Sequence, residues 1–187
     1  MELNVKADGQ AQSADELFDV VDERDQVIGQ EKRGVVHAKK LRHRAVHVMC
    51  VDEAGRVFLQ RRSMAKDSAP GRWCASCSGH VDAGEDYDVA AVRELEEEIG
   101  AKVEAGALRR WLRLEAVRET GNEFVWVYRV KHAGPFTLNP AEIMDGRWLT
   151  RAEIDAAVAE RPRDFAGAFR YFWAKLDWAA AAGAGAD

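Results

Sequence analysis

The sequence predicts a single α/β domain in which a mixed β-sheet lies between helices, and three observations lead to this prediction. Short apolar stretches rich in β-branched and aromatic residues alternate with polar turns along much of the chain. A few segments with helical periodicity stand between and after these stretches, which favours layers of helix packed on sheet. The length of 187 residues suits one domain with a sizeable core, and no repeat or linker divides it.

The predicted strands begin with two hairpins and continue to near the end of the domain. Glycine, aspartate and asparagine mark the turns between them. We interpret residues 31–44, between the two hairpins, as a basic loop that carries histidines. The segment FVWVYRV has the composition of a central strand. The strands are predicted at residues 17–21, 27–29, 45–52, 56–60, 108–117, 124–130 and 147–149.

Three helices are predicted. Asp86 and Gly100 are good start and stop residues for a helix over 86–99. Thr150 and Glu153 form a capping-box pair for a second helix that runs to about residue 160. Apolar residues at helical spacing indicate a last helix that packs on the core, namely Phe165, Phe169, Phe172 and Leu176. We expect a flexible tail at residues 1–15, one domain over 16–180 and a frayed tail at 181–187.

Composition excludes several classes of function. The net charge of -5 argues against a surface that coats nucleic acid, although a local basic patch can still bind a small anion. The chain has neither an apolar run of membrane-spanning length nor a secretion signal at its start. Three cysteines do not suggest a disulfide framework, so we expect a reducing cytoplasm. We interpret Cys74 and Cys77 as small semi-buried side chains rather than a zinc or redox pair.

The helix predicted over 86–99 has two distinct faces. At steps of about 100° per residue, one face gathers four apolar residues that we expect to be buried, Val89, Val92, Leu95 and Ile99. Another face gathers Glu94, Glu97 and Glu98. Glu94 and Glu98 repel each other, and a divalent cation such as Mg²⁺ or Mn²⁺ would convert that repulsion into ligation. A helical face of glutamates is by itself more often only solvated.

The spacing of residues over the whole segment 79–101 indicates that this helix belongs to a functional motif. Glycine, glutamate, an arginine-glutamate-leucine run, two more glutamates and a glycine recur at fixed intervals, at Gly79, Glu85, Arg93-Glu94-Leu95, Glu97-Glu98 and Gly100. This pattern resembles the Nudix box, with Ala101 as the apolar residue that ends it. A motif with so many specified positions is far more specific than a lone glycine motif.

The resemblance to Nudix hydrolases implies a fold, a reaction and roles for residues. It implies an α/β/α sandwich that hydrolyses a diphosphate linkage in a nucleoside diphosphate derivative. Glu94, Glu97 and Glu98 would hold a divalent metal with help from the Gly79 carbonyl. Glu85 and Arg93 would form a supporting salt bridge. Either Glu98 or Glu94 could act as the general base, and the family does not settle which.

Residues before and after the box are similar to those of a subgroup, the isopentenyl-diphosphate isomerases. The similarity rests on Arg61 to Lys66, Pro70 to Trp73, Ser76 to His80, Asn122-Glu123 and Glu142 to Asp145. It implies that Arg62 and Lys66 contact a diphosphate and that Glu123 lies at a metal site. In the isomerases three histidines, matched here by His37, His43 and His80, join such a site. Here His37 and His43 fall in the predicted basic loop, and we interpret them as surface or loop histidines. His80 falls beside the catalytic loop, and we expect it to bind the substrate. The sequence leaves open whether the three histidines form a second metal site.

Three departures from the isomerase pattern favour a hydrolase. The isomerase cysteine falls at Ser78, and Cys77 lies one residue early, where a strand turns its side chain to the other face. The second glutamate of the isomerase metal site falls at Gly121. The Nudix box is complete, whereas that of isomerases is degraded.

Three hypotheses therefore compete. The first is metal-dependent hydrolysis of a small-molecule diphosphate, with Mg²⁺ or Mn²⁺ and no polymer or membrane partner. The second is isomerisation of isopentenyl diphosphate. The third is a non-catalytic module that binds a nucleotide. A homodimer is only a family-level expectation, and no motif names the substrate.

Overall fold

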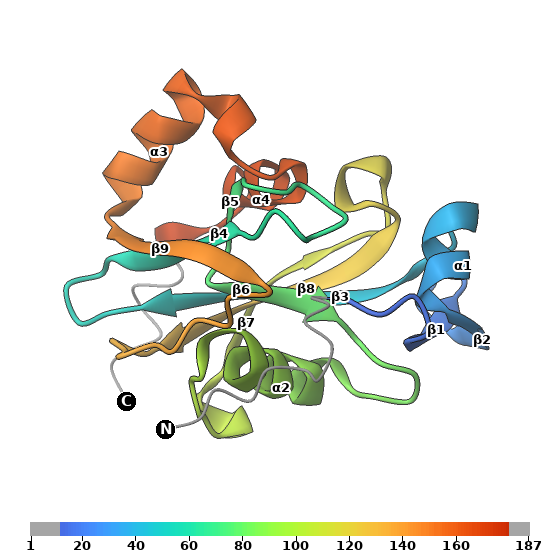
Figure 1. Ribbon diagram of the computed structural model, residues 1–187. Coiled ribbons are helices and arrows are strands. Elements are labelled where there is room, and N and C mark those ends of the chain that lie inside the picture. The colour runs from blue at the N-terminus through green and yellow to red at the C-terminus, as the bar shows by residue number, and fades with distance from the viewer. Residues whose placement is uncertain (1–11, 180–187) are drawn as a thin grey trace.

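A mixed sheet of seven strands lies at the centre of the molecule (Figure 1). The computed structural model describes residues 12–179, so the tail predicted at 1–15 is described only from residue 12 and the one at 181–187 lies outside it. The strand order is β5-β4-β3-β8-β7, with β6 paired to β3 and β9 paired to β4. Strands β3 and β8 are parallel, as the central pair. The strands are β3 (His43–Val51), β4 (Val57–Arg62), β5 (Trp73–Cys74), β6 (Cys77–His80), β7 (Arg109–Leu114), β8 (Glu123–Lys131) and β9 (Ile143–Leu149).

Helices cover both faces of this sheet, which confirms the predicted α/β/α sandwich. Helix α2 (Tyr87–Ile99) lies on one face, and α3 (Arg151–Glu160) and α4 (Gly167–Trp173) lie on the other (Figure 1). The core is accordingly divided into two clusters. Val46, Val48 and Cys50 of β3 pack toward α2, whereas Ala45 and Met49 of the same strand pack toward α4.

A small unit at one end of the sheet differs from the sequence prediction. It consists of a separate hairpin, β1 (Leu17–Val21) with β2 (Val27–Lys32), followed by helix α1 (Arg33–Lys39). The interpretation of residues 31–44 as a loop was therefore wrong. Val36 of α1 is fully buried against Phe18 of β1, and Lys40 ends the helix in a left-handed conformation. Burial of Val36 and of Arg33, which pairs with Asp67 at 2.7 Å, stabilises this short helix, and no repeating sequence pattern predicts it.

Helix α2 runs as predicted, but its buried face is rotated. Asp86 is the residue before the helix, and Gly100, with a φ of 67°, closes it. The prediction that Val89 is buried was wrong, because its side chain is 56% exposed. The small residues Ala90 and Ala91 face the sheet instead and let the helix approach it closely.

The remaining elements follow the sequence prediction with shifted ends. The capping box of α3 is present, with Thr150 Oγ1 accepting from the Glu153 backbone at 3.3 Å. Strand β7 is shorter than predicted and β9 begins earlier, at Ile143. The four apolar residues of the last predicted helix are all buried, as expected: Phe165, Phe169, Phe172 and Leu176.

Candidate active site

The loop after β6 and the helix α2 bring the box residues together at the end of the sheet. Gly79 lies in β6, directly against the carboxylate of Glu94. A Cβ added to Gly79 would lie 2.0 Å from Glu94 Cδ, closer than any real contact. Glycine is required here because the backbone and this carboxylate occupy adjoining space.

Arg93 ties the loop to the helix through several carboxylates. Its Nε donates to Glu85 Oε1 at 2.9 Å and its Nη2 donates to Glu85 Oε2 at 2.8 Å, which makes a bidentate pair. Its Nη1 donates to Glu94 Oε1 at 2.7 Å, and Nη2 also donates to the carbonyl of His80 at 3.0 Å. Arg93 thus fixes the relative positions of the loop and of one candidate metal ligand.

Glu98 is the most enclosed of the helix carboxylates, with 2% of its surface exposed. Its Oε2 accepts from Gln60 Nε2 at 2.7 Å and from the backbone of Ser78 at 3.1 Å. The ammonium of Lys66 lies 3.8 Å from its Oε1. Burial raises the pKa of Glu98, and the charge of Lys66 opposes that rise.

Sequence reasoning gave no role to Glu142, although it lies in the same site. Its carboxylate pairs with the buried Lys66, and the loop before it is fastened to the end of α2 by the bond from Asn139 N to Glu98 O at 2.8 Å. Glu142 follows Asn139, Pro140 and Ala141 in a turn-like segment. The only sequence signal was its place in the isomerase-like segment, because its partners are far away along the chain.

These residues line one cavity with an unusual balance of charge. Glu94, Glu97 and Glu98 all face it, together with Gly79, Ser78 and His80. Arg62 is not among its lining residues, because its Nε donates to Ser68 O and its Nη1 to Ser78 Oγ. Glu123 also lies outside it. Six carboxylates and two basic side chains line the cavity: Glu16, Asp82, Glu94, Glu97, Glu98 and Glu142 against Lys66 and Arg93.

Burial, and after it the charge of the neighbouring Glu98, raises the pKa of Glu94 to about 8. Since the unfolded value is 4.5, Glu94 in the folded protein holds its proton over the range between these values. In the metal-free protein, the contribution of Glu94 to stability therefore falls as the pH rises from about 4.5 toward 8.

We expect Mg²⁺ or Mn²⁺ to raise Tm more at about pH 8 than at about pH 5, because a cation held by Glu94 would replace its proton. Thermal unfolding with and without the metal at both pH values measures this difference. Glu94→Gln should remove most of the pH dependence. An equal rise in Tm at both pH values would contradict the expectation.

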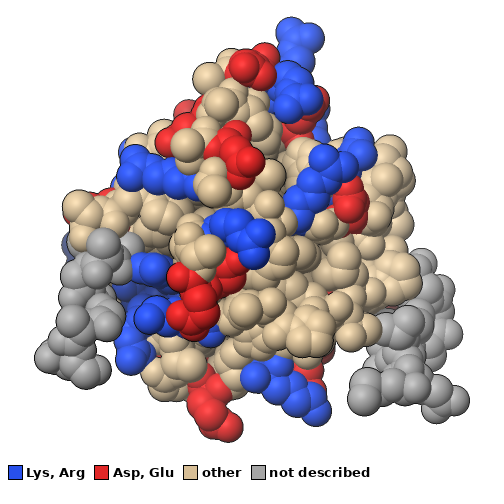
Figure 2. All heavy atoms as spheres, turned by 90° about the vertical axis from the view of Figure 1, so that its left-hand side faces the viewer, with Lys and Arg blue, Asp and Glu red and all other residues tan. Residues whose placement is uncertain are grey.

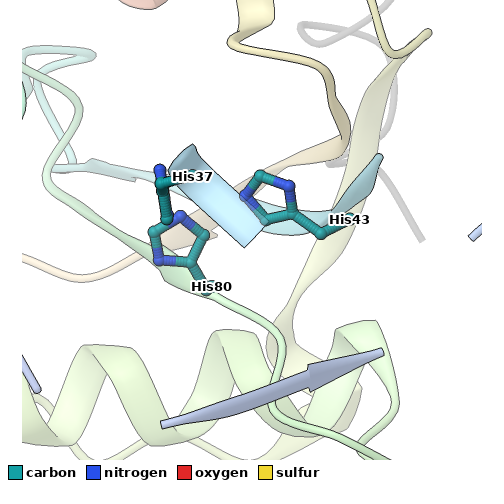
Figure 3. Close-up of side chains that lie close together, drawn as sticks. All are labelled: His37, His43 and His80. Carbon is teal, nitrogen blue, oxygen red and sulfur yellow. The ribbon is translucent and has the colours of Figure 1, made fainter. Parts of the chain in front are cut away.

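Three histidines gather next to this cavity (Figure 3). His37 comes from α1, His43 from β3 and His80 from β6, and each pair of ring centroids lies 5.1 Å apart. One ligand atom from each lies within 4.8 Å of the others. His43 is buried in a strand, so its interpretation as a surface or loop histidine was wrong.

Glu123 completes the histidine cluster. Its Oε1 lies 3.3 Å from His80 Nε2 and 3.5 Å from His43 Nε2. His43 Nδ1 lies 2.9 Å from the carbonyl of Leu41, which can only accept, so a neutral ring has its lone pair on Nε2. That lone pair and the carboxylate face each other, and a cation between them would satisfy both.

Ser78 and Cys77 are successive residues of strand β6, but their side chains have different surroundings. Cys77 is fully buried among the residues that pack toward α2, and burial raises its thiol pKa well above the ordinary value. Ser78 instead pairs with His47 in the register of β3 and accepts from Arg62. The two side chains thus point to opposite faces, and Cys77 does not take the place of Ser78. Cys74 is also buried, so both cysteines lie on strands in the interior.

Acidic and basic side chains are interspersed over the face shown in Figure 2, as far as the described residues form it. Among residues 12–179, no helix is both long enough and apolar enough to cross a bilayer.

The α/β/α sandwich, with its glutamate-lined loop and helix at the end of the sheet, is the architecture that the resemblance to Nudix hydrolases implied. Comparison with known proteins agrees: the NUDIX domain model matches residues 41–169. The chain belongs to the Nudix family and is a Nudix hydrolase. Members of this family act on nucleoside diphosphate derivatives and generally use divalent cations.

Relatives and solved structures support the same assignment. The chain is 40% identical over 156 residues to an uncharacterized Nudix hydrolase of Streptomyces coelicolor, covering 82% of this chain and 84% of that one. It is 33% identical over 158 residues to isopentenyl-diphosphate Delta-isomerase 1 of Aromatoleum aromaticum, covering 82% and 85%. A crystal structure of a Deinococcus radiodurans protein superimposes with a TM-score of 0.75 at 27% identity, covering 86% of this chain and 98% of that one. The similarity to both hydrolases and an isomerase matches the predicted subgroup.

Proposed function

We propose that the cavity beside α2 hydrolyses the diphosphate linkage of a nucleoside diphosphate derivative with the help of Mg²⁺ or Mn²⁺. The observation that carries this proposal is the set of six carboxylates against two basic side chains in the cavity wall. A diphosphate is itself anionic, so it can enter such a cavity only with cations that neutralise both partners. Oxygen donors of this kind suit Mg²⁺ or Mn²⁺.

We propose separate roles in metal binding and proton transfer for the residues of the cavity. Glu94, Glu97 and Glu98 would hold the cation with the carbonyl of Gly79, and Arg93 with Glu85 keeps Glu94 in place. When bound, a divalent cation neutralises the diphosphate oxygens and makes water a better nucleophile. We assign the acceptance of that water's proton to Glu98, and this assignment is supported by its enclosure and by its raised pKa.

Lys66 would bind the diphosphate at the opposite wall of the cavity. Its ammonium pairs with the carboxylate of Glu142 and lies 3.8 Å from Glu98 Oε1. Arg62 is buried and its Nη1 donates to Ser78 Oγ, so we propose that it supports the cavity wall next to the substrate phosphate. His80 lines the cavity and also belongs to the histidine cluster.

A metal-dependent substrate screen tests the proposed function. Purified protein is incubated with Mg²⁺ or Mn²⁺ and with nucleoside diphosphates, nucleotide sugars and dinucleotides, and the released phosphates are measured. We expect cleavage of at least one class, and loss of that cleavage when a chelator removes the metal. Saturable binding of a nucleotide with no turnover under any metal would instead favour a non-catalytic binding module.

We also propose that the histidine cluster binds a second divalent cation. Three imidazoles and one carboxylate suit zinc, iron or manganese better than magnesium. The arrangement of His43 supports this, because its buried Nε2 has no hydrogen-bond partner and faces Glu123.

Replacement of one histidine should distinguish metal binding at the histidine cluster from metal binding at the carboxylates of α2. We expect His37→Ala to weaken the binding of Zn²⁺ or Mn²⁺ at the cluster by at least about 100-fold, since one ligand is lost. Equilibrium dialysis of the metal-free protein measures the number and affinity of sites. His132→Ala, outside the cluster, should change nothing. Unaltered binding by His37→Ala would contradict the assignment.

The isomerase hypothesis is favoured by one specific observation, the placement of Glu123 between His43 and His80. It lacks an acid at Ser78, because a serine hydroxyl has no accessible pKa and Cys77 points to the other face. We therefore expect no deuterium incorporation into isopentenyl diphosphate above background in D₂O. Measurable incorporation would restore isomerisation as the function.

A further inference from the structure

The hairpin of β1 and β2 lies outside the matched family domain, which begins at residue 41. It nevertheless contacts the loop between β6 and α2 at three successive residues. Phe18 forms a β-bridge with Asp82, and Ala83 N donates to Leu17 O at 2.9 Å. Gly84 N donates to Asp19 Oδ2 at 2.9 Å. Strand β1 therefore extends along the whole of this turn.

Asp19 is the side chain that makes this contact. It is only 4% exposed, and its second oxygen accepts from Gln30 Nε2 at 2.9 Å, which fixes the orientation of the carboxylate. Gly84 has a φ of 76°, a conformation in which its N–H points out of the turn toward Asp19. The bond is charge-assisted and partly buried, so it is stronger than an ordinary turn contact.

The turn that Asp19 holds is continuous with the candidate catalytic residues. Glu85 follows Gly84 directly and its Oε2 also accepts from Asp82 N at 3.0 Å. Glu85 then holds Arg93 in a bidentate pair, and Arg93 holds Glu94. A displacement of the turn would therefore reach Glu94 through two ion pairs.

We propose that Asp19 is a positioning residue for hydrolysis, which acts through Gly84, Glu85 and Arg93 on the metal-binding carboxylate of Glu94. The proposal rests on the proposed roles of the box glutamates. Asp19 touches neither the cavity nor the substrate in this scheme. Its neighbour Phe18 packs on the rings of His80 and His43, so the same strand supports the histidine cluster on its other face.

Asp19→Ala tests the proposal, with Asp22→Ala as the matched control. Asp22 lies in the same hairpin and accepts from Arg24 N and Gln26 N, so its loss loosens the hairpin turn without touching Gly84. We expect Asp19→Ala to lower kcat about 10-fold and raise the Mn²⁺ concentration for half-maximal activity, with KM for substrate little changed. Amide exchange of Gly84, measured by NMR, should become faster in Asp19→Ala only.

Two results would overturn the proposal: wild-type kcat in Asp19→Ala, or a loss of kcat equal to that of Asp22→Ala. If Asp19→Ala does not fold, Asp19→Asn decides, because its amide oxygen can still accept from Gly84 but without charge. It should show an intermediate kcat and faster exchange at Gly84, and wild-type values for both would reject the role. The exchange measurement needs no substrate, so a wild-type protein without hydrolytic activity would reject the proposed function and leave the contact of Asp19 to be judged separately.

Discussion

Glu98→Gln should lower kcat by on the order of 10³-fold at saturating metal, the largest effect that we expect from any single substitution. The substitution keeps the shape of the side chain but removes the charge that would bind the cation and accept a proton. It also places an amide where Glu98 now accepts from Gln60 and from Ser78 N. The measurement is the initial rate of diphosphate hydrolysis as a function of metal concentration.

Glu96→Gln is the control for this experiment. Glu96 lies on the same helix but is exposed, and its ion pair is with Lys102 at 3.3 Å. Its rate should match that of the wild type. Glu98→Gln should also stay folded, because burial already favours the uncharged form of this side chain. A folded Glu98→Gln protein with wild-type kcat would remove Glu98 from the mechanism.

Gly79→Ala should reduce kcat by about 100-fold or more, although the added group is a single methyl. The new Cβ would overlap the carboxylate of Glu94, so either the β6 backbone or the carboxylate must move. A shift of about 1 Å in a catalytic group is enough for a loss of this size. We also expect weaker binding of Mn²⁺, measured by equilibrium dialysis, since both the Gly79 carbonyl and Glu94 are displaced.

Gly29→Ala controls for the change of glycine to alanine. Gly29 lies in β2, its φ is not in the left-handed region, and no atom lies within 4 Å of an added Cβ. Activity and metal binding should therefore stay at the wild-type level. If Gly79→Ala behaved in the same way, the close approach of Gly79 to Glu94 would have no part in catalysis.

The fold and the carboxylate set of the active site were accessible from sequence for different reasons. Strands such as β8 and the hairpin after β3 have local signals in composition and turns. The box could be identified because its residues lie within one loop and one helix, where spacing along the chain determines spacing in space. Its start and stop residues also defined α2 to within one residue.

What the sequence analysis missed depends on contacts between distant segments. Helix α1 is stabilised by the burial of one valine, Val36, against Phe18 of a neighbouring strand. The face of α2 that packs on the sheet is decided by Ala90 and Ala91, not by the more hydrophobic Val89. Glu142 pairs with Lys66, which is 76 residues away in the sequence, and no local pattern predicts such a pair. Asp19 and Gly84 are 65 residues apart.

The position of bound metal tests the central claim most directly. Crystals soaked with Mn²⁺ and a non-hydrolysable nucleoside diphosphate analogue would locate the cation by its anomalous scattering. Our account predicts manganese at the carboxylates of Glu94, Glu97 and Glu98 and the carbonyl of Gly79, with the diphosphate beside Lys66. Manganese found only at His37, His43 and His80, with the diphosphate away from α2, would contradict it.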